Sequence, residues 1–251
     1  MKISVTIITL NEERNIERCI LSVEDVADEI IVLDSFSTDL TEGICKLHKV
    51  RFVQRKWEGY SQSKNYLNDL AQFDYILSLD ADEALDDELK EEILKLKALN
   101  EPEIYCLNRL TNYCGKWIKH SGWYPDVKVR LFPKKGSYWS GEFVHEELVF
   151  PANIPVKQLN GHLEHYSYYS FKDHRERADI YSTLTALKMY KKGKRASIVK
   201  PFLSGIMRFV KMYILERGFL DGKMGFKIAQ ISCQSNVFKY KELRRLTHEG
   251  K

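Results

Sequence analysis

Apolar runs of strand length alternate with amphipathic segments through the first 100 residues of the chain. Ile3 to Ile8 is a β-branched run, and runs of similar character occupy residues 29–34, 50–54 and 75–80. The segments between and after them have helical character, at residues 12–23, 39–48, 61–72 and 87–99. Strands that alternate with helices in this way are typical of βαβ units and a parallel sheet. The pattern therefore predicts an α/β fold, with Asn11 as the cap of the first helix.

The pattern changes after Pro102. Aromatic and turn residues become dense up to residue 170, and Val127 to Phe132 alternates as a strand does. From Phe171 the chain becomes helical again, with basic and aromatic residues interleaved. We therefore expect three parts, which are residues 1–100, residues 101–170 and a basic helical extension at residues 171–251.

Composition narrows the class of protein. The chain has 251 residues, of which 44% are hydrophobic and 29% charged, as in globular proteins. Its five cysteines are scattered and form no C-x-x-C pair, so the sequence indicates neither a disulfide framework nor a zinc site. They suit a reducing compartment. No secretory signal and no run of about 20 apolar residues is evident, so we expect a cytoplasmic protein without a membrane span.

Charge is distributed unevenly along the chain. Residues 171–251 carry 19 Lys and Arg against 7 Asp and Glu, whereas residues 1–170 carry 20 against 28. An acidic first part is unsuited to phosphate backbones, so no nucleic-acid partner is expected. The basic last part suits a polyanion or an anionic membrane surface. Its apolar segment at residues 200–215, with spaced cations, fits an interfacial helix and equally an ordinary packed helix.

The strongest candidate chemistry lies where the fourth apolar run ends, in Asp80-Ala81-Asp82. Side chains at positions i and i+2 of a strand point the same way, so the two carboxylates are expected to share one side. Carboxylate oxygens suit a hard divalent cation, which can neutralise a diphosphate. A strand that runs into an acidic turn is the alternative interpretation. Thr9, Asn11, Glu12 and Asp34 follow the first two runs, and ligands of parallel sheets bind at such strand ends.

Three motifs in this order resemble family 2 glycosyltransferases with the GT-A fold over about residues 3–150. They are Ser4-Val5-Thr6-Ile7-Ile8-Thr9-Leu10-Asn11-Glu12-Glu13, Ile31-Val32-Leu33-Asp34-Ser35-Phe36-Ser37-Thr38-Asp39 and Leu79-Asp80-Ala81-Asp82-Glu83. Further motifs resemble the lipopolysaccharide-core β-1,4-glucosyltransferases over nearly the whole chain. They include Trp57-Glu58-Gly59-Tyr60, Gly122-Trp123-Tyr124-Pro125-Asp126, Val144-His145-Glu146 and Asp221-Gly222-Lys223-Met224-Gly225-Phe226.

The resemblance implies a Rossmann-like GT-A domain with a mostly parallel central sheet and a helical C-terminal extension. Residues 1–100 would bind the nucleotide sugar and residues 101–170 the acceptor. Asp34 would bond the base, Asp80 the ribose or the metal, and Asp82 would coordinate Mg²⁺ or Mn²⁺. Thr9, Asn11 and Glu12 would lie near the nucleotide, although a carboxylate at a helix start, such as Glu12, needs no such role.

A transferase also needs a base for the acceptor hydroxyl, and Asp126 is our candidate. Glu146 is its rival and Glu83 a weaker one. A single base and one displacement would invert the anomeric centre.

Three cations have open interpretations. His145 would be a metal ligand or a structural residue, and Arg130 a phosphate contact or a sheet-edge residue. Lys64 would reach the diphosphate or be a solvated lysine. The tryptophans at 117, 123 and 139, with Tyr124, are candidates for stacking on a sugar, and core packing is their alternative.

By resemblance, the function is a metal-dependent inverting transfer of a hexose, with UDP-glucose as the favoured donor, onto the lipopolysaccharide inner core. The acceptor would be a lipid-linked glycan, and the protein would have peripheral contact with the cytoplasmic face of the inner membrane. Another acceptor, such as a polyprenyl phosphate or a capsule glycan, and a non-catalytic nucleotide-sugar-binding protein are the alternatives.

Overall fold

The computed structural model describes residues 1–99, 103–141 and 146–249. Its strands are β1 (Ile3–Thr9), β2 (Glu29–Asp34), β3 (Arg51–Gln54), β4 (Tyr75–Asp80), β5 (Glu83–Leu85), β6 (Ile104–Tyr113), β7 (Lys116–Trp117), β8 (Asp126–Pro133), β9 (Tyr138–Ser140), β10 (Glu147–Val149), β11 (Val156–Gln158) and β12 (Leu163–Tyr168). Its helices are α1 (Ile16–Val23), α2 (Thr41–Leu47), α3 (Tyr60–Leu70), α4 (Asp87–Leu99), α5 (Phe171–Lys191), α6 (Lys200–Val210), the π-helical turn η1 (Lys211–Leu215), the 3₁₀ helix η2 (Gly218–Asp221) and α7 (Gly222–Glu249). None of the described helices combines the length and hydropathy that a membrane-spanning segment requires.

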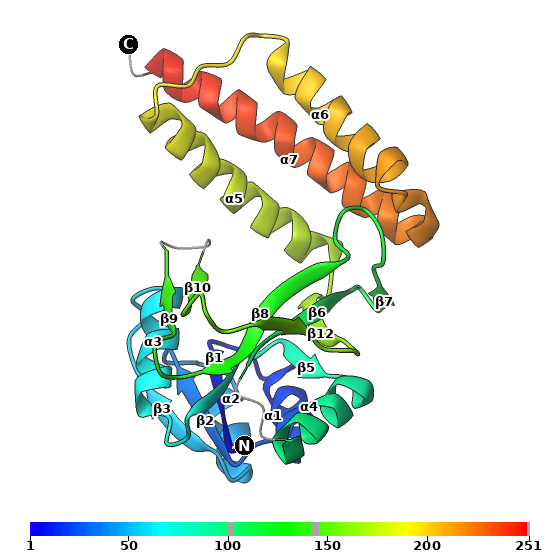
Figure 1. Ribbon diagram of the computed structural model, residues 1–251. Coiled ribbons are helices and arrows are strands. Elements are labelled where there is room, and N and C mark those ends of the chain that lie inside the picture. The colour runs from blue at the N-terminus through cyan, green and yellow to red at the C-terminus, as the bar shows by residue number, and fades with distance from the viewer. Residues whose placement is uncertain (100–102, 142–145, 250–251) are drawn as a thin grey trace. The chain divides into compact units, whose positions relative to one another are not determined.

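The main sheet has the strand order β3-β2-β1-β4-β8-β6-β12-β5, with β7 and β11 also paired to β6 (Figure 1). The block β3-β2-β1-β4 is parallel throughout, and β8 then pairs antiparallel with both β4 and β6. The expected α/β class, with a mostly parallel central sheet and a helical C-terminal extension, is confirmed.

The chain divides into two compact units, each with its own core. The first comprises Met1–Arg109 and Asp126–Tyr166, and the second comprises Leu110–Pro125 and Ser167–Lys251. Residues 110–125, which the sequence placed with the acceptor-binding part, belong to the unit that contains the C-terminal helices.

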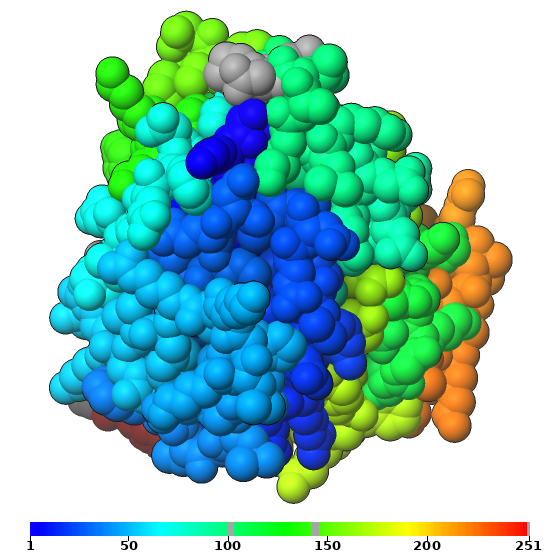
Figure 2. Space-filling view, turned by 90° about the horizontal axis from the view of Figure 1, so that it is seen from below, coloured from blue at the N-terminus to red at the C-terminus, as the bar shows by residue number. Residues whose placement is uncertain are grey.

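Side chains that alternate along the strands of the first unit are buried in two apolar clusters, one on each face of its sheet. In β1, Ile3, Val5 and Ile7 join one buried cluster, which includes residues of α1 and α4. Ile8 joins the opposite cluster with Leu67 of α3. The fully buried strands therefore read as continuous apolar runs, as parallel strands covered on both faces do. Residues 1–70, blue to cyan, form much of the face that Figure 2 shows.

One local expectation in this unit is wrong, and one short strand was not predicted. Asn11 does not cap the first helix, because α1 starts at Ile16 with Asn15 at its N-cap position. Asn11 instead adopts a left-handed backbone, with φ of 55°, and its side-chain oxygen accepts the backbone N–H of Thr38 at 2.8 Å. The strand β5 directly after Asp82 was not predicted, since three residues are too short for a periodic signal.

The second unit is a layer of long helices in which α7 lies between α5 and α6 (Figure 1). Asp221, 3% exposed, anchors the loop at residues 115–123 to the start of α7. Its carboxylate accepts the backbone N–H of His120 at 3.0 Å and contacts the His120 ring at 3.0 Å, while its backbone oxygen accepts Lys116 Nζ at 2.7 Å. The Asp221-Gly222-Lys223-Met224-Gly225-Phe226 motif therefore has a structural role.

Gly225 permits the tight approach of α7 to η2. A Cβ at this position would overlap the backbone oxygen of Gly218. By contrast, a Cβ at Gly43, inside α2, meets nothing within 4 Å. The two helical glycines thus have opposite steric surroundings.

We expect Gly225→Ala to lower the free energy of unfolding by about 1–3 kcal/mol, because backbone must move to admit the methyl group. Gly43→Ala is the matched control, and should raise it by up to about 1 kcal/mol, since alanine favours a helix over glycine. Urea denaturation followed by circular dichroism measures both. Equal effects of the two substitutions would contradict the steric role of Gly225.

Candidate active site

The ends of three parallel strands meet at one edge of the sheet, as the sequence predicted. Thr9 of β1 lies opposite Asp34 of β2, and Ile8 lies opposite Asp80 of β4. Asp34 and Asp80 are therefore two strands apart on the same rim, with β1 between them. This rim is the expected binding edge of a parallel sheet.

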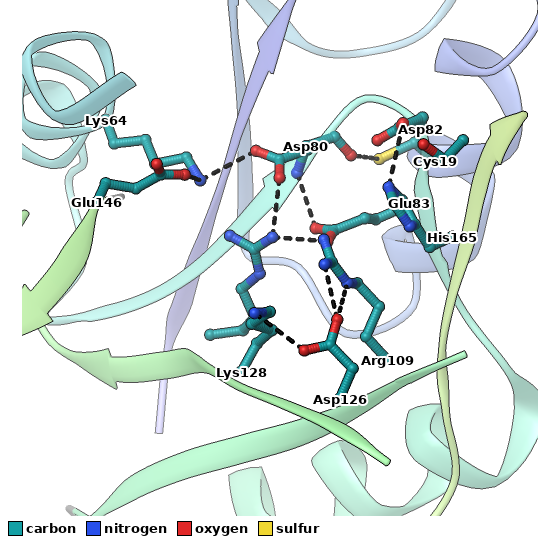
Figure 3. A network of polar contacts seen from close by, with 12 residues as sticks. Cys19, Lys64, Asp80, Asp82, Glu83, Arg109, Asp126, Lys128, Glu146 and His165 are labelled. Carbon is teal, nitrogen blue, oxygen red and sulfur yellow. Dashed lines mark hydrogen bonds and ion pairs between the residues drawn. The ribbon is translucent and has the colours of Figure 1, made fainter. Parts of the chain in front are cut away.

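Asp80 is held by two buried cations (Figure 3). Its Oδ1 lies 3.0 Å from Lys64 Nζ and its Oδ2 accepts Arg130 Nη2 at 2.8 Å. Burial by itself would raise the pKa of Asp80, but the charges of Lys64 and Arg130 outweigh it and hold that pKa far below its ordinary range. Asp80 is therefore a permanent anion, and both of its oxygens are engaged.

Lys64 is not the solvated lysine of our alternative interpretation, because its side chain is 1% exposed. Besides Asp80 it faces Glu146 Oε1 at 3.8 Å, and its ammonium lies 4.7 Å from the centre of the Trp139 ring. Trp139 is itself 6% exposed and packs against Phe132, so it belongs to the core.

Glu83 joins the two arginines of the site. Its side chain has no exposed surface, and its Oε1 accepts Arg130 Nη2 at 2.6 Å and lies 3.4 Å from Arg109 Nη1. Its Oε2 accepts the backbone N–H of Asp80 at 3.0 Å. Complete burial favours a charge-pairing role for Glu83 over that of a base, which would have to reach an acceptor hydroxyl.

Asp126 forms an ion pair with the same Arg109 guanidinium that contacts Glu83. The Nε and Nη2 atoms of Arg109 lie 2.8 and 2.7 Å from Asp126 Oδ2, and Lys128 Nζ lies 2.9 Å from Oδ1. Burial opposes ionisation of Asp126, but Arg109 and Lys128 outweigh it and lower its pKa. One side of this carboxylate still reaches solvent, with 27% of the side chain exposed.

Asp82 lies apart from this network, although it is only two residues from Asp80. The strand β4 ends at Asp80, so the argument from strand alternation was wrong at Asp82, which lies in a turn. Its Oδ2 lies 3.3 Å from His165 Nε2 of β12. Burial raises the pKa of Asp82, and the opposing charge and hydrogen bond of His165 bring it below its ordinary value.

The acidic character of this corner also affects Cys19 of α1. Burial raises the pKa of the Cys19 thiol well above its ordinary value, and the negative charges of Glu83, Asp82 and Asp80 raise it further. Its Sγ lies 3.8 Å from the backbone oxygen of Asp80. Cys19 therefore remains a neutral thiol packed beneath the rim.

The residues after β1 and β2 form a mutually bonded pair of loops. Asp34 is fully buried and accepts the Ser37 N–H at 2.9 Å and the Gln54 amide at 3.1 Å. Glu12 accepts the Asn15 amide at 2.7 Å, and the Thr9 side chain is buried at 5% exposure. In these positions Asp34 and Glu12 organise the loops, and the contact of Glu12 with Asn15, at the start of α1, is compatible with both interpretations of Glu12.

The candidates that remain include His145 and the tryptophans. His145 lies outside the described residues. Trp123 packs in the second unit with Tyr113 and Tyr168, at ring distances of 5.5 and 5.7 Å. His174 completes that cluster, and burial lowers its pKa to about 4. Core packing thus accounts for Trp123 as well as Trp139.

Sequence patterns missed Glu83 as a structural anion, Arg109 and His165. Arg109 and His165 lie on β6 and β12, distant in sequence from Asp80 and Asp82, and no short motif surrounds them. Strand alternation could have shown which face of the sheet the Arg109 and His165 side chains occupy. It could not have identified the residues that they contact.

Comparisons relate this chain to known proteins. The model of the family described as "Glycosyl transferase family 2" matches residues 4–147. An uncharacterized glycosyltransferase of Rickettsia typhi is 32% identical, over 98% of this chain and 88% of its own length. The lipopolysaccharide core biosynthesis glycosyltransferase LpsC of Rhizobium meliloti is 28% identical, over 90% of this chain and 86% of its own. Among solved structures, S. aureus TarS in complex with UDP aligns over 100% of this chain and 92% of its own, at 15% identity and a TM-score of 0.47.

The buried carboxylate of Glu83 generates a stability prediction. We expect Glu83→Gln to lower the free energy of unfolding by about 3–5 kcal/mol, because two largely buried guanidinium groups would lose their shared counter-charge. Urea denaturation measures the loss. Glu91→Gln, an exposed site on α4, is the control and should change stability by less than about 0.5 kcal/mol. A Glu83→Gln protein as stable as the control would show that the network does not depend on this charge.

Proposed function

Because the chain belongs to glycosyl transferase family 2, and is therefore a glycosyltransferase, we propose that it transfers a hexose from a nucleotide sugar to the lipopolysaccharide inner core with inversion. The donor is proposed to be UDP-glucose. The observation that carries the proposal is the rim on which Asp80 and Asp126 stand as anions among Lys64, Arg109 and Arg130, with Asp82 nearby beside His165. The relative named as a lipopolysaccharide core biosynthesis glycosyltransferase supports the acceptor class.

The donor would lie along the rim with its base near the loops that Asp34 and Asn11 organise. Asp80 is oriented by Lys64 and Arg130, and it is proposed to receive the ribose. For Lys64 or Arg130 to contact the diphosphate directly, each would have to loosen its ion pair with Asp80. The main role proposed for Lys64 and Arg130 is therefore to fix the orientation of the Asp80 carboxylate.

A divalent cation, Mg²⁺ or Mn²⁺, fits the chemistry of the Asp82 corner. No three His, Cys, Asp or Glu side chains within residues 1–99, 103–141 and 146–249 gather into a metal site. A magnesium ion that bridges phosphates usually takes only one or two protein carboxylates, however, and Asp82 with His165 offers an oxygen and a nitrogen. When bound, the cation supplies Lewis-acid stabilisation of charge on the departing nucleoside diphosphate.

Asp126 is proposed as the base that receives the proton of the acceptor hydroxyl. Its lowered pKa keeps it ionised at neutral pH, and Arg109 fixes its orientation through two nitrogens. Glu146 remains the rival, since Lys64 is 3.8 Å away and it too stands beside the rim. With one base and no second carboxylate assigned as a nucleophile, a single displacement inverts the anomeric centre.

The acceptor is proposed to be a lipid-linked glycan, which brings the protein into peripheral contact with the cytoplasmic face of the inner membrane. Purified protein with radiolabelled UDP-glucose and Mn²⁺ should label a lipopolysaccharide inner-core acceptor. Labelling of a polyprenyl phosphate or a capsule glycan in its place would keep the chemistry and change the acceptor. If no nucleotide sugar that is tested supports either transfer or donor hydrolysis, the result would favour a non-catalytic nucleotide-sugar-binding protein.

Asp82→Asn should reduce transfer about a thousandfold, because a neutral amide binds the cation weakly and several kcal/mol of leaving-group stabilisation are lost. His165→Ala should raise the Mn²⁺ concentration needed for half-maximal rate. Water-proton relaxation measures Mn²⁺ binding independently of transfer. Asp69→Asn, an exposed carboxylate on α3, is the control and should match the wild type. Unchanged Mn²⁺ binding in the Asp82 variant would remove the metal site from this corner.

Asp126→Asn should lower kcat by roughly 10²–10⁴-fold with a smaller effect on donor binding, as loss of a base does. Lys128→Met removes one cation that depresses the pKa of Asp126, so that pKa should rise. Because the base acts when ionised, the acid limb of the pH–rate profile should then move to higher pH. An unshifted acid limb in Lys128→Met, or a fully active Asp126→Asn, would transfer the role to Glu146.

A further inference from the structure

The helix α6 presents an apolar stripe to solvent, and among the packed helices of its unit only Lys241 of α7, 5.4 Å from the Phe202 ring, is described against it. Val199, Phe202, Leu203, Ile206 and Met207, here called the α6 stripe, each leave between 54% and 65% of their surface exposed. Their spacing places them on one side of the helix. Ile214 and Leu215 of η1 continue the apolar surface, with 54% and 72% exposed. Such helical spacing ordinarily marks the side of a surface helix that is buried.

The opposite side of α6 is the one that packs within the unit. Pro201, Gly205 and Met212 are buried there. A Cβ on Gly205 would stand 2.6 Å from Val237 and 3.2 Å from the Cys233 backbone oxygen, so α6 approaches α7 closely at this point. The fold therefore uses small and compact side chains for the contact and leaves the large apolar ones outside.

Charge within residues 199–215 has one sign, although Glu216 follows directly and its Oε1 lies 3.5 Å from Lys211 Nζ. Residues 200–215 contain Lys200, Arg208 and Lys211 and no Asp or Glu, and all three cations are exposed. Helical spacing places Lys200 and Lys211 beside the stripe, along the same edge. An exposed apolar side with lysines at its border is the composition of a helix that lies in the interface of an anionic bilayer.

We propose that the α6 stripe docks on an anionic phospholipid surface, with Phe202, Leu203, Ile206 and Met207 inserted among the acyl chains and headgroups. Lys200 then contacts a lipid phosphate, and Lys211, which is 58% exposed beside Glu216, contacts a second one. This contact rests on the proposed function only in that a lipid-linked acceptor gives the enzyme a reason to be at a membrane. The docking itself involves no donor, acceptor or metal.

An exposed apolar stripe can also pack against the same stripe of a second copy of the chain. The charges oppose it, because two stripes packed face to face would bring the lysine borders of both copies together without a carboxylate from α6 between them. The helix α5 provides a useful contrast. It also exposes Ile180 and Leu184, by 60% and 55%, but the exposed charges near them have both signs, Arg175 and Arg177 beside Glu176 and Asp179, whereas residues 200–215 carry no acid.

Sedimentation with vesicles tests the proposal. The full chain should bind vesicles of phosphatidylcholine and phosphatidylglycerol in equal parts, should bind phosphatidylcholine alone far less, and should be released by high salt. Leu203→Ser/Ile206→Ser should weaken binding by roughly tenfold or more, since two apolar side chains no longer enter the bilayer. Ile180→Ser/Leu184→Ser removes a pair of similar exposure from α5 and should bind as the wild type does.

Three results would overturn the assignment. The wild-type chain could fail to bind anionic vesicles, or both double variants could weaken binding equally. Light scattering could also reveal a dimer that only the α6 variant dissociates, which would assign the stripe to a second copy. Donor hydrolysis in solution, measured on the same samples, distinguishes these failures from failure of the proposed transfer, and thermal melts verify that both variants are folded.

Discussion

The buried carboxylate of Glu83 is the constraint on which the site depends. An ionised group without solvent exposure must be paired, and Arg130 with Arg109 pairs it here. A guanidinium has more donors than one carboxylate accepts, so each arginine has capacity left for a second anion. Arg130 uses it on Asp80 and Arg109 uses it on Asp126. One buried anion thereby fixes both the carboxylate at the end of β4 and the one at the start of β8.

This chain of alternating charges explains why the rim is preorganised. Asp80 and Asp126 each sit between two cations, and the charges of those cations keep the pKa of both carboxyls low. Groups that are already oriented and ionised need little rearrangement when substrate charge develops beside them. Asp82 is different, because the side chain that pairs with it is the His165 imidazole and not a permanent cation. The carboxylate that is least committed within the cluster is thus the one proposed to take the divalent ion.

Sequence reasoning worked where local periodicity determines structure. It located β1, β2, β3 and β4, and with them the shared rim, because parallel register brings their ends together. It failed at Asp82, where the strand stops two residues earlier than alternation assumed, and at Asn11, where a left-handed backbone replaces a cap. It also missed Arg109 and His165. Their partners come from β5, from β8 and from the turn between β4 and β5, through contacts between distant segments that no pattern within one segment encodes.

The α6 segment illustrates a further limit of periodicity. Its sequence fits an interfacial helix and a packed helix equally, because both have one apolar side. The two kinds of helix differ in which side of α6 packs against α7. That side is determined by the close approach of Gly205 to Val237 of α7, which lies 32 residues further along the chain. Since Gly205 admits α7 only on the side of small residues, the large apolar side chains have no place in the core of the unit. Close helix packing and an exposed apolar stripe are therefore two consequences of the same glycine.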